Sequence, residues 1–240
     1  MRTRLYVATG LLLAVSVPVA VHAVQPSRAT MPFDDARLKI EYNATDGDAG
    51  LQFFVDAEDW KQVVIANPRG RTVLDVDAGR VISNYGLTEL FSESSEPPFS
   101  EFSFERFKQL FPEGVYTFTG QSIDGQRLKS TFRLSHTVPD GAVISSPADG
   151  STVSADRVAV EWGPVVTPAG IDIVAYEVLV VADDSGLGTA ERTVDVTLPA
   201  TATRLDIPPE FLTPGGYKTE VLAIERNGNQ TLTEVAFNVT

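Results

Sequence analysis

Short runs of residues that alternate between hydrophobic and polar side chains recur along almost the whole chain, and they constrain its fold most. Each run is rich in β-branched and aromatic residues and ends at Gly, Pro, Asn or Asp, which is typical of β-strands joined by tight turns. In the first half the runs cover residues 38–42, 51–55, 63–65, 72–76, 115–119 and 130–134. Asn-Pro-Arg-Gly at 67–70 and Ile-Asp-Gly-Gln at 123–126 predict hairpin turns. The sequence therefore predicts an all-β protein.

One segment departs from this pattern and predicts a short helix. Its hydrophobic residues recur at helical spacing: Phe104, Phe107, Leu110 and Phe111. Ser103 suits the N-cap position, and Pro112 ends the helix. An apolar stripe of this kind is expected to cover the core of a β-sandwich.

The strand pattern breaks at residues 137–141, and this break predicts two domains in tandem. Residues 34–139 are expected to form a β-sandwich-like domain that includes the short helix, and they match no family. Residues 140–240 contain a second series of short strands with turns at regular spacing, which is the pattern of an immunoglobulin-like sandwich. We therefore expect two β-sandwich domains.

The second domain carries motifs of one family. Trp162 ends the strand-like run 158–162, Tyr176 and Val178 begin another run, and residues 212–217 read Leu-Thr-Pro-Gly-Gly-Tyr. In these features residues 142–240 resemble the fibronectin type III family. The resemblance implies that Trp162 lies in the core between two sheets and that Tyr217 forms a tyrosine corner. The whole chain is similar to exported bacterial proteins with a β-rich domain before a type III domain.

The N-terminus predicts export from the cytoplasm. A positively charged start, an apolar run over 5–20 and a small-x-small triplet at 21–23 predict a secretory signal peptide over residues 1–23. A retained membrane anchor is the alternative, which the short apolar run and Pro18 disfavour. Residues 24–33 are expected to be a tail. We expect a periplasmic or secreted protein with no transmembrane segment after cleavage of the signal peptide.

Composition excludes several classes of function. The chain has no cysteine and a net charge of −13, so we expect no disulfide, no thiolate metal site and no nucleic-acid partner. Once His22 leaves with the signal peptide, His136 is the one histidine, and neither a Gly-x-Ser-x-Gly nor a phosphate-binding glycine motif is present. We therefore expect no catalytic residue, no cofactor and no enzyme activity.

An acidic turn is the first candidate binding site. Asn43, Asp46 and Asp48 alternate with small residues, and such oxygen ligands on a tightly turning backbone suit calcium. The match to a calcium loop is partial, since Gly50 and Ala57 stand where oxygen ligands are needed. A plain hairpin turn explains the same residues. Both interpretations stay open, with calcium the one candidate ion.

Trp60 is the second candidate, as a ligand-binding residue. Its polar neighbours predict partial exposure, so it can stack on a sugar ring, with Tyr85 as an extension. A rim tryptophan that covers the core is the alternative. A group of acids around two prolines could in principle serve a glycosidase, but we expect a solvated loop: Glu89, Glu93, Glu96 and Glu101.

These observations favour an exported, non-enzymatic protein. Its β-sandwich modules are expected to serve binding, adhesion or envelope assembly, with a protein or glycan as partner. The alternative is a calcium-dependent or glycan-binding accessory protein.

Overall fold

The computed structural model describes residues 29–183 and 192–240 and is mostly β, which confirms the predicted fold class. The predicted signal peptide (1–23) lies outside the described residues. The strands are β1 (Asp35–Asn43), β2 (Asp48–Ala66), β3 (Thr72–Asp77), β4 (Leu87–Glu93), β5 (Gly114–Ser122), β6 (Arg127–Leu134), β7 (Ile144–Ser146), β8 (Ser151–Val153), β9 (Ala159–Trp162), β10 (Ile173–Ala182), β11 (Thr193–Pro199), β12 (Arg204–Asp206), β13 (Gly215–Glu225) and β14 (Gln230–Val239). The helix α1 spans Phe104–Leu110, and short 3-10 helices span Ile82–Asn84, Ala155–Arg157 and Pro209–Phe211.

Strand β2 organises the N-terminal half. The sequence predicted two strands, at 51–55 and 63–65, but they belong to one strand of 19 residues. Its first part pairs with β1 and β4, and its second part pairs with β3 and β5. The pairing register shifts between Asp56 and Trp60, where Asp59 has a φ of 50°. The residues between the two predicted strands therefore form a bulge, which bends the strand without ending it.

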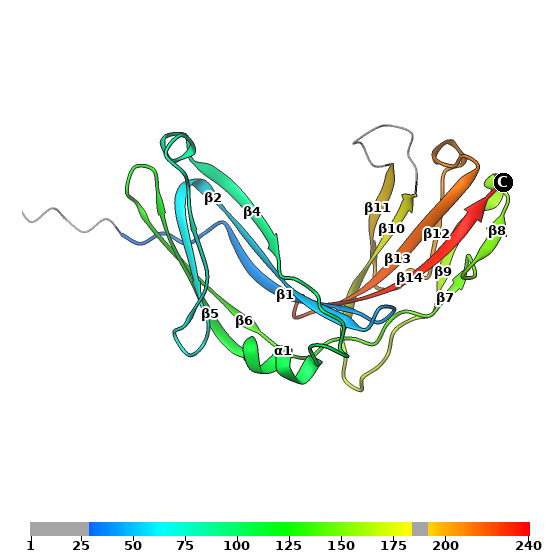
Figure 1. Ribbon diagram of the computed structural model, residues 1–240, viewed down its shortest axis with the longest axis horizontal. Coiled ribbons are helices and arrows are strands. Elements are labelled where there is room, and N and C mark those ends of the chain that lie inside the picture. Colours follow the sequence, from blue (N-terminus) through cyan, green and yellow to red (C-terminus); the bar gives the residue numbers. More distant parts are fainter. Residues whose placement is uncertain (1–28, 184–191) are drawn as a thin grey trace, which may run out of the picture.

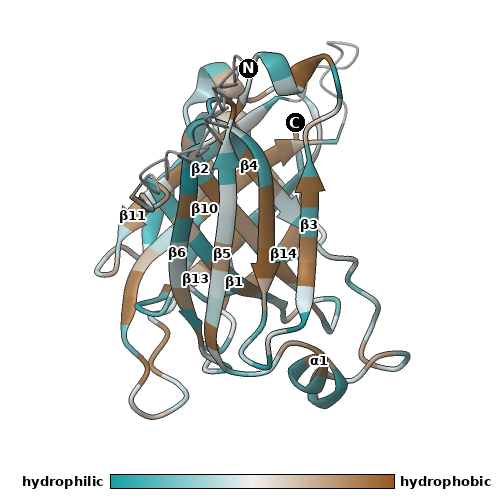
Figure 2. Ribbon diagram, turned by 90° about the vertical axis from the view of Figure 1, so that its left-hand side faces the viewer, coloured by the Kyte–Doolittle hydropathy of each residue, from teal (hydrophilic) through white to brown (hydrophobic). Residues whose placement is uncertain are grey.

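The bent strand encloses a single hydrophobic core in this half. Leu51 and Val55 from the first part of β2 belong to the same buried cluster as Val63 and Ile65 from the second part. Figure 2 shows hydrophobic and hydrophilic residues interleaved along β3, as expected of a strand with one face toward a core.

Helix α1 lies where it was predicted. The Ser103 side chain accepts a hydrogen bond from the Arg106 N–H, which confirms the predicted N-cap. Phe107 is buried and packs between Phe104 and Phe111. Leu110, expected on the same face, is the last residue of the helix and is 57% exposed, whereas the following Phe111 packs against the core.

The C-terminal half has the immunoglobulin-like arrangement that the resemblance implied. One sheet has the strand order β12-β9-β7, and the other contains β11-β10-β13-β14. Trp162 is buried between them, and its ring lies 5.5 Å from that of Tyr176. The Tyr217 hydroxyl donates to the Thr213 carbonyl (2.9 Å) and accepts from the Thr213 N–H (2.7 Å). The predicted tyrosine corner is thus confirmed.

The two halves share a sheet, which the sequence did not predict. Strand β1 pairs in parallel with β14 from Glu41↔Gln230 to Asn43↔Leu232. This short ladder joins both halves into one 11-stranded sheet, which Figure 1 shows as two arms that meet where β1 and β14 lie side by side. Each arm keeps its own buried core.

Residues 29–33, part of the predicted tail, are ordered against the edge of β6. The Met31 N–H donates to the Arg127 carbonyl (2.9 Å), and the Lys129 N–H donates to the Met31 carbonyl (2.8 Å). Phe33 is 4% exposed and packs into the core. This segment covers part of an otherwise open strand edge. No helix in the described part of the chain is long and apolar enough to cross a membrane.

Candidate functional site

A groove of about 490 Å³ lies between the two halves. Strands β1 and β2 of the N-terminal half line one side of it, and β10 and the β13–β14 turn of the C-terminal half line the other. The groove therefore exists because β1 and β14 pair and bring the two arms together. Grooves of this size between domains are the usual location of binding sites.

The N-terminal side of the groove is aromatic. Phe54 on β2 and Phe91 on β4 are directly opposite each other in the strand register, so their rings share one face of the sheet. The Arg37 guanidinium lies 4.5 Å from the centre of the Phe54 ring, a cation–π contact. Phe91 is 58% exposed, which is unusual for a phenylalanine on a strand. This wall offers apolar surface to a partner.

The floor of the groove carries paired polar groups from both halves. Lys39 of β1 donates a hydrogen bond to Gln230 of β14 at 2.9 Å. Burial lowers the pKa of Lys39, and the charges of Glu41 and then Glu177 act against this shift. Burial also raises the pKa of Glu177 on β10, with the charge of Asp195 adding to it. The Lys39 ammonium of one half and the Glu177 carboxylate of the other thus attract each other at a site that is partly shielded from water.

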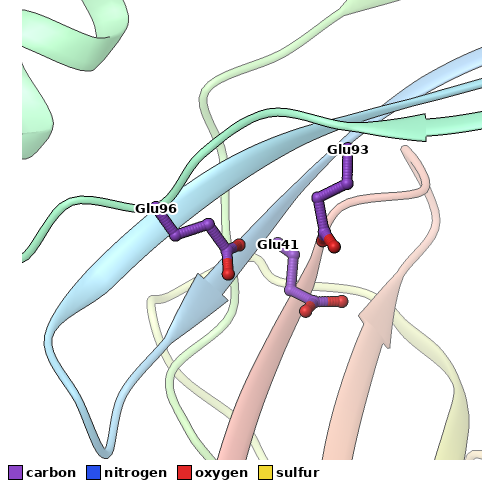
Figure 3. A group of neighbouring side chains, drawn as sticks. All are labelled: Glu41, Glu93 and Glu96. Carbon is purple, nitrogen blue, oxygen red and sulfur yellow. The ribbon is translucent and has the colours of Figure 1, made fainter.

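Beside this floor lies a cluster of three carboxylates, which we call the carboxylate cluster: Glu41 on β1, Glu93 at the end of β4 and Glu96 just after it. One carboxylate oxygen of each lies within 4.8 Å of the others, and Figure 3 shows the three side chains converging. Gly50 allows this approach, because a Cβ there would lie 2.3 Å from Glu96 Oε1. Two hydrogen bonds hold the chain before Glu96 on β2, from Leu51 N–H to Ser94 Oγ (2.9 Å) and from Ser94 N–H to the Leu51 carbonyl (3.0 Å).

Two glutamines connect the cluster with the groove. Gln52 Nε2 donates to Glu41 Oε2 at 3.0 Å and to Glu93 Oε1 at 2.6 Å. Gln230 Nε2 also donates to Glu41. Both glutamines line the groove and are buried. The groove and the carboxylate cluster therefore share side chains and form one continuous site.

The carboxylates of the cluster repel one another, and this repulsion helps to raise the pKa values of Glu41 and Glu96. Burial, followed by the charges of Glu93, Glu41 and Asp48, raises the pKa of Glu96 to about 7. Burial also raises the pKa of Glu41, and the pKa of Asp48 is raised by burial and by Asp46. Protonation or a cation relieves such repulsion between neighbouring carboxylates.

The structure places Asn43, Asp46 and Asp48 in the turn between β1 and β2. Asn43 Oδ1 accepts the backbone N–H groups of Thr45 (2.9 Å) and Asp46 (3.0 Å), and Asn43 Nδ2 donates to Asp46 Oδ2 (3.2 Å). The turn is thus held by its own hydrogen bonds, as in an Asx turn. Asp48 differs, since its charge acts on Glu96 in the carboxylate cluster. Calcium binding by all three residues stays a prediction.

Trp60 is more deeply buried than the sequence predicted. The sequence predicted partial exposure, but Trp60 is 0% exposed and its Nε1 donates to the Thr88 carbonyl at 2.9 Å. The bulge at Asp59 accounts for this difference, because an extra residue changes the face toward which the next side chains point. A buried indole offers no face to a sugar, and Tyr85, at 82% exposure, has no tryptophan beside it as a platform.

Sequence reasoning found only part of the carboxylate cluster. Glu93 and Glu96 were grouped with Glu89 and Glu101 as a solvated loop, whereas the structure brings the first two to Glu41, about fifty residues earlier in the sequence. The available signal was the alternation of β1, which places Glu41 on the polar face.

His136 lies at the end of helix α1, where its Nε2 is hydrogen-bonded to the Phe111 carbonyl (2.7 Å).

Comparison with known proteins finds no matching family model and no matching curated protein. Among solved structures, the chain is similar to a tetra-tandem repeat in the extending region of a large adhesion protein, with 14% identity and a TM-score of 0.29, covering 86% of this chain and 50% of that one. It is also similar to the FN1–FN3 domains of chicken CNTN1 (9% identity, TM-score 0.33, 89% and 65% coverage). A third is the BSP domain of a biofilm-associated protein (15% identity, TM-score 0.26, 85% and 29% coverage).

The chain thus spans less than two thirds of the length of each of these structures. At such low identities and TM-scores the likenesses carry no argument about function.

Proposed function

We propose that this chain is an exported, non-enzymatic protein that binds a protein or glycan partner in the groove between its two halves, in adhesion or envelope assembly. The signal peptide predicted over residues 1–23 supports export. The observation that carries the binding role is the aromatic wall, where Arg37 lies over Phe54 beside the exposed Phe91. An exposed aromatic surface next to a few fixed polar groups is what recognition sites share.

The polar floor supports the same role. Lys39, Glu177 and Gln230 come from both arms, so a partner in the groove contacts both halves at once. Such a partner gains apolar contact from the wall and orientation from the floor.

A site-directed photo-cross-linker tests this proposal. The cross-linking residue is placed at position 91, inside the groove, or at position 143, where Val143 is 75% exposed and does not line the groove. In producing cells we expect a discrete cross-linked product from position 91 and none from position 143. The same comparison is made on a glycan array with the labelled chain.

Affinity for the captured protein or glycan is then measured with Phe91→Ala, and with Val143→Ala as the control. We expect Phe91→Ala to weaken binding at least about 10-fold, because truncating an aromatic anchor removes most of its contact area. Val143→Ala is expected to bind like the native chain. Equal affinity of all three chains would place the partner elsewhere, and turnover of a bound glycan would contradict the non-enzymatic role.

A further inference from the structure

We propose that the carboxylate cluster is a calcium site. Glu41, Glu93 and Glu96 supply its first three oxygen ligands, and Gln52 and Asp48 supply further ones. Calcium binds oxygens at about 2.3–2.6 Å, so two ligands on opposite sides of the ion are about 5 Å apart. Carboxylate oxygens within 4.8 Å of one another can therefore all contact a single ion.

The charge around the cluster favours a cation. The three glutamates and Asp48 act on one another electrostatically. Lys39 is the cation whose charge acts on Glu41 and Glu93, and its ammonium is hydrogen-bonded to Gln230. One partly buried ammonium does not balance four neighbouring carboxylates. A divalent ion at the centre turns this repulsion into attraction.

Oxygens without hydrogen-bond donors are a second, independent observation. Gln52 is 7% exposed, and its Oε1 finds no hydrogen-bond partner among the described residues. Its amide lies in the cluster, since Nε2 contacts both Glu41 and Glu93. A half-turn of this amide puts Oε1 where Nε2 now lies, facing the same two carboxylates. The buried Asp48 Oδ1 likewise finds no donor in the described part of the chain. Buried polar atoms in native proteins are normally satisfied by protein groups or ordered water, and a bound ion satisfies an oxygen in the same way.

The ligand set selects calcium over other metals. All the donors are carboxylate or amide oxygens, which suit hard cations and not zinc or copper. Magnesium requires a tighter octahedron at about 2.0–2.1 Å and keeps most of its waters, whereas calcium accepts six to eight oxygens in irregular geometry. Because Gly50 has no side chain, Glu96 has room to approach the other carboxylates, and the hydrogen bonds between Leu51 and Ser94 fix the chain just before it.

The site also lies at the junction of the two halves. Glu41 is paired in register with Gln230 of β14, and Gln230 donates to its carboxylate. A ligand that is itself hydrogen-bonded from a second element is typical of metal sites, because the outer contact orients the ligand. A bound ion would thus strengthen the connection between the arms.

Calorimetric titration tests the proposal. The purified chain is stripped with EDTA and titrated with calcium chloride at pH 7.5, and separately with magnesium chloride. We expect one calcium per chain, with a Kd between about 10⁻⁵ and 10⁻³ M, and magnesium binding at least about 10-fold weaker. No heat at millimolar calcium, or equal affinity for magnesium, would overturn the proposal.

Matched variants locate the ion. Glu93→Gln combined with Glu96→Gln is expected to weaken calcium binding at least about 30-fold, because two charged ligands are lost. Glu89→Gln combined with Glu101→Gln removes two acids of the same segment outside the cluster and is expected to bind normally. Native affinity in the first pair would rule out the cluster, and loss of binding in Asp46→Asn alone would assign the ion to the β1–β2 turn instead. A melt in EDTA shows that each variant is folded.

This inference is independent of the proposed partner. Calcium binding is measured with no partner present, so its failure leaves the groove proposal standing. In the same way, Phe91→Ala is expected to titrate calcium like the native chain.

Discussion

At the scale of single residues, Glu96 is a carboxyl group whose pKa the fold raises far above its ordinary value. Burial and three neighbouring carboxylates raise its pKa to about 7, from an ordinary value of 4.5. Between these two pH values the folded chain holds a proton that the unfolded chain has lost, so folding becomes less favourable as pH rises. The stabilising contribution of the protonated group is fully present below about pH 4.5 and is lost through about pH 7.

Glu96→Gln tests this directly. In EDTA at pH 8 we expect the variant to melt a few degrees above the native chain, because a neutral amide avoids the repulsion. The fall of Tm between pH 5 and pH 8 should also become shallower, although the partly buried Glu41, Glu177 and Glu220, whose pKa values are also raised, keep part of it. Glu101→Gln, on an exposed residue, is the control and should leave the slope unchanged. A lower Tm for Glu96→Gln at pH 8 would contradict the assignment.

At the scale of elements, the bulge in β2 is the feature on which the N-terminal half depends. It turns Trp60 into the core and lets one strand pair with four others. The bulge needs space beside it in the segment that precedes β4. Gly86, with a φ of 92°, lies so close that a Cβ there would be 2.8 Å from Asp59 Cα. Backbone cannot move aside as a flexible side chain can.

Gly86→Ala is therefore expected to destabilise the chain by about 2–3 kcal/mol, through the clash and the unfavourable φ. Urea denaturation at equilibrium measures this as a lower midpoint. Gly79→Ala is the matched control, since no atom lies within 4 Å of its Cβ position, and it is expected to change stability by less than about 0.5 kcal/mol. Equal midpoints for the two variants would show that the bulge tolerates a side chain.

At the scale of the whole molecule, Asn229 links the two arms. It is 1% exposed, and its Oδ1 accepts the Ile40 N–H at 2.8 Å. Its Nδ2 donates to the carbonyls of Ser135 (2.9 Å) and Thr137 (2.8 Å). One side chain in the β13–β14 turn thus satisfies three backbone groups of the N-terminal half and the following connection.

Asn229→Ala removes the side-chain partner of the Ile40 N–H and of the Ser135 carbonyl, while the Thr137 carbonyl still accepts from Asn227 Nδ2 (3.0 Å). This loss is expected to cost about 2–4 kcal/mol and to uncouple the arms. The chain has two tryptophans, Trp60 in one core and Trp162 in the other, so replacing either by Phe makes the other a fluorescent reporter of its own half. We expect coincident urea midpoints for the two reporters in the native background and separate midpoints with Asn229→Ala. Asn238→Ala, exposed on β14, should keep them coincident. Coincidence in both backgrounds would mean that Asn229 does not couple the halves.

Features that depend on a few neighbouring residues could be predicted from the sequence. The strand periods, the Ser103 cap of α1 and the Tyr217 corner all rest on contacts within about four residues along the chain. Their signals therefore lie in short stretches of sequence, and the all-β class follows from adding them together.

Tertiary structure alone decided the rest. The bulge reversed the expected exposure of Trp60, and the pairing of β1 with β14 joined residues 189 positions apart, from Glu41 to Gln230. That pairing made the groove. The pairing of β4 with β2 brought Glu93 to Glu41, and the path of the chain after β4 brought Glu96 there. Contacts between distant segments leave no periodic signal in either one, because each strand alternates in the same way whichever partner it meets.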